Sequence, residues 1–65
     1  MHPEDIKALL RKRGMTQAKL ARELGVSKTT VGYVIAGRTL SRRVADAVAL
    51  ATGLPLAKLW PGKYS

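Results

Sequence analysis

The connector Gly25-Val26-Ser27 restricts the fold of this chain more than any other feature, because it leaves three residues between two helical segments. The segment QAKLAREL before it and the segment KTTVGYVIA after it both carry apolar residues three and four positions apart. Gly25 suits the left-handed conformation that ends a helix, and Ser27 suits the position that caps the next one. The connector therefore predicts a helix-turn-helix, in which a three-residue turn joins two short helices.

Similar start and stop signals divide the rest of the chain, and no stretch alternates between apolar and polar residues as a strand would. Pro3, Thr16 and Ser41 are typical of helix starts, whereas Gly53 and Pro61 are typical of helix ends. We expect an all-α fold, a compact bundle of four to five short helices that contains a helix-turn-helix. The expected helices are residues 3–13, 17–24, 28–36, 42–52 and 56–60, in a single domain of residues 1–65 with a loose tail at 61–65.

The apolar positions of these helices predict one small shared core, because no linker separates the segments. The expected core residues are Ile6, Leu9, Leu10, Leu20, Ala21, Leu24, Val26, Val31, Val34, Ile35, Val44, Val48, Leu54 and Leu59.

The charge of the chain favours an anionic partner. Twelve Lys and Arg residues against four Asp and Glu give a formal charge of +8, which attracts nucleic acid first and an anionic membrane surface second. There is no cysteine and only one histidine, His2, so we expect no metal site, no cofactor and no enzymatic activity. A secretory signal and a membrane-spanning run are both missing from the sequence, which favours a cytoplasmic, nucleoid-associated protein without a membrane partner.

The helix expected over residues 28–36 has a buried face and an exposed face. Burying Val31, Val34 and Ile35 turns a set of small and hydrogen-bonding side chains outward, at 100° per residue. Lysine can donate to guanine, threonine can contact any base, and tyrosine can donate to a base or a phosphate. The candidate base-reading residues are Lys28, Thr29, Gly32 and Tyr33.

Residues around this face are candidates for contacts with the DNA backbone. Three arginines follow the helix, and a helix that starts after Ser41 presents N–H groups that can receive a phosphate. The candidate backbone contacts are Gln17, Ser27, Thr30, Arg38, Ser41, Arg42 and Arg43. For Lys7, Arg11, Lys12 and Lys19, a solvated helix surface is the favoured interpretation.

Gly32 needs a specific explanation, because glycine inside a helix costs about 1 kcal/mol relative to alanine. Its neighbours on the outward face are polar, which favours close approach to DNA. Packing against a neighbouring helix is the alternative.

The residues of this motif resemble a known family. The pattern Gln17-x-x-Leu20-Ala21-x-x-x-Gly25-Val26-Ser27-x-x-x-Val31-x-x-Val34 resembles the helix-turn-helix of phage repressors and Cro proteins, the lambda-repressor-like family. The stretches HPEDIKALLRKRGM, VADAVALATGLP and LWPGKY are similar to the Ner-like regulators of transposable phages. The resemblance implies a five-helix domain that binds an operator. It also implies that Lys28, Thr29 and Tyr33 face bases in the major groove, and that Gln17 binds the backbone or helps to read the bases.

The resemblance and the charge together predict a sequence-specific regulator that binds double-stranded DNA, a phage or prophage repressor acting in pairs or as a homodimer, without a small-molecule effector. A sequence-tolerant nucleic-acid-coating or architectural protein is the first alternative, and a basic membrane- or protein-docking module is the second. The apolar residues Leu56, Trp60 and Tyr64 have two interpretations: Trp60 seals the core, or these residues form a surface for self-association.

Overall fold

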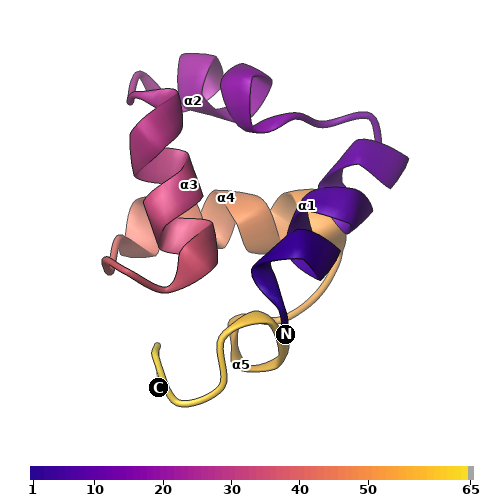
Figure 1. Cartoon of the computed structure of the whole chain (residues 1–65), viewed down its shortest axis with the longest axis vertical. Helices are drawn as coiled ribbons and strands as arrows, with labels where there is room; N and C mark the ends of the chain where they lie inside the picture. Colours follow the sequence, from indigo (N-terminus) through magenta and orange to yellow (C-terminus); the bar gives the residue numbers. More distant parts are fainter. Residues whose placement is uncertain (65) are drawn as a thin grey trace.

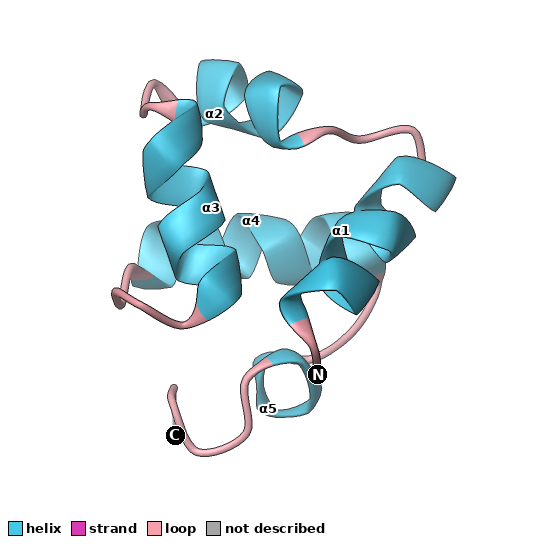
Figure 2. Ribbon diagram, viewed as in Figure 1, coloured by secondary structure: helices cyan, strands magenta, loops and turns pink. Residues whose placement is uncertain are grey.

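The computed structural model describes residues 1–64, which form five helices. These are α1 (Pro3–Lys12), α2 (Gln17–Leu24), α3 (Lys28–Ala36), α4 (Arg42–Thr52) and α5 (Leu56–Leu59). Helix α4 lies behind α1 and α3, while α2 lies across one end of α3 (Figure 1). Residues 1–64 contain helices and loops but no strand, which confirms the predicted all-α fold (Figure 2). None of the helices in this part of the chain is long and apolar enough to cross a membrane.

Local capping interactions define the starts of the three central helices, as the sequence predicts. In each case a hydroxyl oxygen accepts a backbone N–H group of the first turn, which satisfies a donor without a partner inside the helix. The bonds join Thr16 to the N–H of Lys19 (3.1 Å), Ser27 to that of Thr30 (3.0 Å) and Ser41 to that of Val44 (3.4 Å).

The observed helix ends differ from the predicted ones by one residue at two places. Helix α1 ends at Lys12 and α5 at Leu59, so Arg13 and Trp60 are capping residues and not the last helical ones. Trp60 has φ −137° and ψ 79°, which lies outside the helical region. Gly25 closes α2 at φ 70°, the left-handed conformation that the connector predicted.

One core joins the five helices, and most of its members were predicted. Leu9, Leu24, Val26 and Leu54, expected in the core, are only half-buried, and the last three pack at its edge. Thr52 is also buried, and its hydroxyl is satisfied because it donates to the carbonyl oxygen of Ala49 at 3.2 Å. The buried apolar residues are Ile6, Leu10, Leu20, Ala21, Val31, Val34, Ile35, Val44, Ala45, Val48, Leu59 and Trp60.

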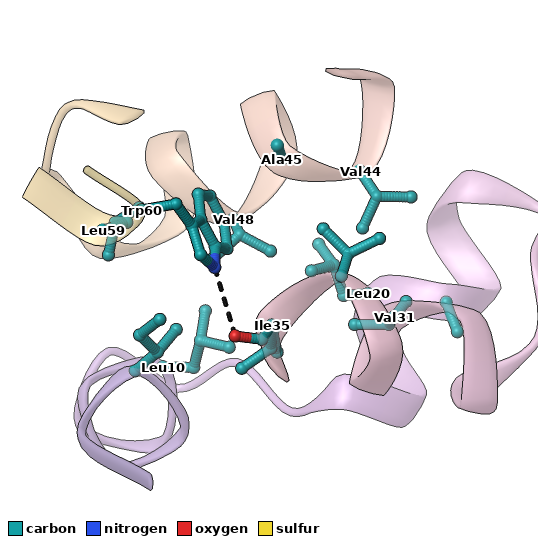
Figure 3. Close-up of a cluster of buried hydrophobic side chains, with 12 residues drawn as sticks. Leu10, Leu20, Val31, Ile35, Val44, Ala45, Val48, Leu59 and Trp60 are labelled. Carbon is teal, nitrogen blue, oxygen red and sulfur yellow. Dashed lines mark hydrogen bonds between the residues drawn. The ribbon is translucent and has the colours of Figure 1, made fainter. Parts of the chain in front are cut away.

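Trp60 belongs to this core, as in the first of its two interpretations. Its side chain is 5% exposed, and its indole N–H donates to the carbonyl oxygen of Ile35 at 3.1 Å (Figure 3). The bond satisfies the one polar group of the indole, so the large ring can be buried without an unpaired donor. Trp60 therefore ties the end of the chain to α3.

Within residues 61–64, part of the tail that the sequence predicted to be loose, Lys63 and Tyr64 contact earlier parts of the chain. The ring of Tyr64 packs edge-on against Trp60, with 5.5 Å between centroids, and the Lys63 ammonium donates to the carbonyl oxygen of Gly37 at 3.3 Å. Ser65, also part of the predicted tail, lies outside the described residues.

Candidate DNA interface

Helix α3 divides sharply into a buried face and an exposed face. Val31, Val34 and Ile35 are at most 1% exposed, so the core holds this helix along its length. Lys28 and Thr29 are exposed on the other side. The 3.6-residue period of the helix thus places the candidate base-reading residues on a rigid support.

The outward face of α3 borders an open groove of about 570 Å³. All four candidate base-reading residues line it, together with Gln17 from the start of α2 and Arg38 from the loop after α3. Lys7 of α1 closes the other side. The lining residues are Lys7, Gln17, Lys28, Thr29, Gly32, Tyr33, Ala36 and Arg38, and none of these side chains is acidic. The surface therefore combines positive charge with hydrogen-bond donors.

Arg38 and Tyr33 lie together at one end of the groove. The guanidinium carbon of Arg38 is 5.8 Å from the centroid of the Tyr33 ring, within the range of a cation–π contact. Tyr33 is 47% exposed and Arg38 is exposed as well, so both side chains reach solvent. The contact uses the ring face and none of the N–H donors of Arg38. The arginine can therefore donate to an anion while it rests on the tyrosine.

The environment of Gly32 explains how α2 and α3 share this surface. A Cβ atom on Gly32 would lie 3.2 Å from Oε1 of Gln17, closer than ordinary van der Waals contact. The absence of a side chain at Gly32 makes room for the amide of Gln17 over α3. The structure thus identifies Gln17 as the neighbour in the packing interpretation of Gly32. Close approach of Gly32 to DNA remains a prediction.

Residues 1–65 match the model of a family described as winged helix-turn-helix DNA-binding. The chain belongs to this family. No curated protein and no solved structure matches the chain. In this winged helix-turn-helix chain, α2, Gly25-Val26-Ser27 and α3 form the helix-turn-helix, and residues 1–64 form no β-wing. The groove beside α3 is accordingly the candidate DNA interface.

The other candidate backbone contacts lie outside the lining of the groove, and their side chains have partners within the chain. Ser27 and Thr30 share a hydrogen bond of 2.8 Å between their hydroxyl oxygens. Ser41 caps α4, as described above. Arg42 donates to the Asp46 carboxylate at 3.1 Å, and Arg43 donates to the carbonyl oxygen of Leu24 at the end of α2. Contacts between these five residues and DNA remain predictions.

Lys7 and Ala36 line the groove but were not among the candidate residues. For Lys7, the sequence favoured a solvated surface, and its ammonium is 3.2 Å from the Glu4 carboxylate. Periodicity places Lys7 on the polar face of α1, but it does not show that this face borders α3. Only the packing of α1 against α3 brings Lys7 to the groove.

The candidate self-association residues have different surroundings. Trp60 is buried within the chain, while Leu56 and Tyr64 are half-buried. The most exposed large apolar side chains are Leu50, at 86%, and Leu40, at 62%, and both lie outside this set. Self-association through Leu56 and Tyr64 remains a prediction.

Proposed function

We propose that this DNA-binding domain is a sequence-specific transcriptional regulator, a phage- or prophage-type repressor of the lambda-repressor-like and Ner-like kind. It inserts α3 into the major groove of double-stranded DNA. The observation that carries this proposal is the groove beside α3, where Lys28, Thr29 and Tyr33 project from a helix whose opposite face is buried. Hydrogen-bonding side chains on a rigid helix are what reading of base edges requires.

Phosphate contacts supply much of the affinity in this proposal. Gln17 and Arg38 line the groove. The further candidate contacts lie outside its lining and are Ser27, Thr30, Ser41, Arg42 and Arg43. Because bound phosphates release counterions, affinity should fall steeply with salt, in line with the net charge of +8. The protein would act without catalysis, cofactor or small-molecule effector, at the nucleoid in the cytoplasm.

Two copies would bind together, because one recognition helix reads only a few base pairs. Half-sites one helical turn apart are separated by roughly 34 Å. The longest extent of the molecule is 27 Å, so two copies fit side by side at that spacing.

Enrichment of bound duplexes from a random pool tests this function. We expect a palindromic site with half-sites about ten base pairs apart, bound at physiological salt far more tightly than random duplex. Equal affinity for the enriched and random duplexes would contradict the proposal. That result would favour a sequence-tolerant coating or architectural protein.

A further inference from the structure

The segment Trp60–Tyr64 reaches back to the end of α3 and to the loop that follows it. Three hydrogen bonds connect the two regions, and each joins residues more than twenty positions apart in the sequence. The Trp60 indole donates to the carbonyl oxygen of Ile35, and the Lys63 ammonium donates to that of Gly37. The hydroxyl oxygen of Tyr64 accepts the backbone N–H of Ser41 at 3.4 Å.

These bonds complete the end of α3. The last carbonyl groups of a helix lack partners inside the helix. Backbone N–H groups of the turn donate to the carbonyl oxygens of Tyr33 and Val34. The indole N–H of Trp60 donates to the carbonyl oxygen of Ile35 (Figure 3). The carbonyl of Gly37, just beyond the helix, is taken by Lys63.

The loop held in this way, residues 37–41, carries Arg38. Lys63 holds the start of the loop at Gly37, and Tyr64 holds its end at Ser41. Between these two points, Arg38 rests against the Tyr33 ring at the groove. The C-terminal segment thus restricts the backbone from which Arg38 extends.

We propose that Lys63 and Tyr64 are positioning residues for DNA binding, which hold the loop of residues 37–41 so that Arg38 meets a phosphate. The inference rests on the proposed function of the groove. Neither residue needs to touch DNA for this role. Their contribution is a smaller conformational freedom of the loop before binding, so that less entropy is lost when the complex forms.

The burial of the two residues separates this role from a role in folding. Trp60 is in the core, whereas Lys63 is exposed and Tyr64 is half-buried. The Lys63 bond is exposed and the Tyr64 bond is part-buried, and one hydrogen bond contributes only about 1 kcal/mol to the stability of a fold. Removal of the Lys63 or Tyr64 bond should therefore loosen the loop without unfolding the domain.

Tyr64→Phe is the sharpest test, because it removes one hydroxyl without changing the charge or the packed ring. We expect the Kd for a duplex to rise about two- to fivefold, which is at most the effect of losing the Arg38 contact itself, about 1 kcal/mol. We also expect the salt dependence of log Kd to weaken by about 0.9, as for one lost phosphate contact. A purely structural role would lower the unfolding midpoint and leave the salt dependence of the folded protein unchanged.

A double-mutant cycle with Arg38→Ala tests whether Tyr64 acts through Arg38. If it does, Tyr64→Phe has almost no further effect on Kd once Arg38 has been replaced. Additive effects of the two substitutions on Kd would overturn the proposal, as would a wild-type Kd and salt dependence in Tyr64→Phe.

Lys63→Met has a matched control in Lys58→Met, because each removes one positive charge near the C-terminus. Lys58 is exposed on α5, and the side-chain hydrogen bonds from the C-terminal segment to the loop of residues 37–41 come from Lys63 and Tyr64. We expect Lys63→Met to raise Kd several-fold more than Lys58→Met, the margin of about one hydrogen bond. Equal effects would show that Lys63 contributes only its charge, and would remove it from the positioning role.

The outcome can be separated from the outcome for the proposed function. Sequence preference is measured by competition between enriched and random duplexes. The cycle between Tyr64 and Arg38 can be measured on random duplex alone, because a phosphate contact does not depend on base sequence. A protein without sequence preference could still show the positioning role in the cycle. Additivity in the cycle would contradict the positioning role but not the sequence preference.

Discussion

The groove beside α3 and the start of α4 both carry cationic side chains next to the helix-turn-helix. Those side chains differ in the partners that they have within the chain. In the groove, Lys28 is exposed and Arg38 lies on the face of an aromatic ring. At the start of α4, Arg42 donates to Asp46, and Arg43 donates to the carbonyl oxygen of Leu24. The formal charge of +8 already subtracts the Arg42–Asp46 ion pair, but it still counts Arg43, whose guanidinium is engaged at the end of α2.

The largest expected effect lies in the groove. Lys28→Ala and Thr29→Ala should each lose about 1 to 3 kcal/mol of discrimination between the preferred site and its single-base variants, since they remove contacts to base edges. Affinity for random duplex should change much less. Ranking of bound sites from a random pool measures this effect, and an unchanged ranking in both variants would exclude α3 as the reader.

Arg38→Ala and Arg43→Ala compare the two regions directly, since each removes one guanidinium. Arg38→Ala should weaken binding to all sequences by about 1 kcal/mol and leave the stability of the fold unchanged. Arg43→Ala should weaken binding less, again equally for all sequences, and should lower the free energy of unfolding by about 1 kcal/mol because the end of α2 loses a donor. Urea titrations and binding titrations separate the two contributions. A reversed pattern would mean that the start of α4, and not the groove, supplies the phosphate contacts.

Lys7→Ala tests whether α1 belongs to the DNA surface. We expect the salt dependence of log Kd to weaken by less than about 0.9, because Lys7 lines the groove but its ammonium is already 3.2 Å from the Glu4 carboxylate. Lys19→Ala is the matched control, since Lys19 is exposed on α2 and does not line the groove. If both variants had the same slope of log Kd against log salt concentration, Lys7 would be part of a solvated surface, the interpretation that the sequence favoured.

The smallest expected effect is that of Gly32→Ala. Alanine favours the helix, but the new Cβ must displace the Gln17 amide, so the fold should gain only about half a kcal/mol. The DNA complex should weaken, because the added methyl group and the displaced amide both lie in the groove. Thermal unfolding measures the expected gain in stability, and binding titrations measure the expected loss of DNA affinity. A stabilised variant with unchanged DNA affinity would leave packing against Gln17 as the whole reason for the glycine.

Much of the fold was predictable because its signals are local. The hydroxyls of Thr16, Ser27 and Ser41 each accept the backbone N–H group three residues further along the chain. A short stretch of sequence was therefore enough to predict where each of the three central helices begins. Ala45 and Thr52 were missed in the core, since a methyl group carries little periodic signal and a hydroxyl reads as polar. Trp60 remained ambiguous, because its partner Ile35 lies twenty-five positions away.

The candidate site was predictable in part for the same reason. Helical periodicity identifies the outward face of α3, and the structure places Lys28, Thr29, Gly32 and Tyr33 along one groove. Periodicity does not identify the neighbour that a polar face meets, so the place of Lys7 was missed. The hydrogen bonds of Lys63 and Tyr64 were missed as well, since each depends on a contact more than twenty residues away.

By itself, the sequence determined the five helices, the turn between α2 and α3, and the face of α3 that is left for a partner. Each of these depends on capping, on glycine conformation and on the helical period, which act over a few residues. Only the tertiary structure decided which cationic side chains are engaged within the fold and which are not. It also decided that the C-terminal segment contacts the loop after α3. Those outcomes depend on which elements pack side by side, and long-range packing leaves no periodic pattern in a single sequence.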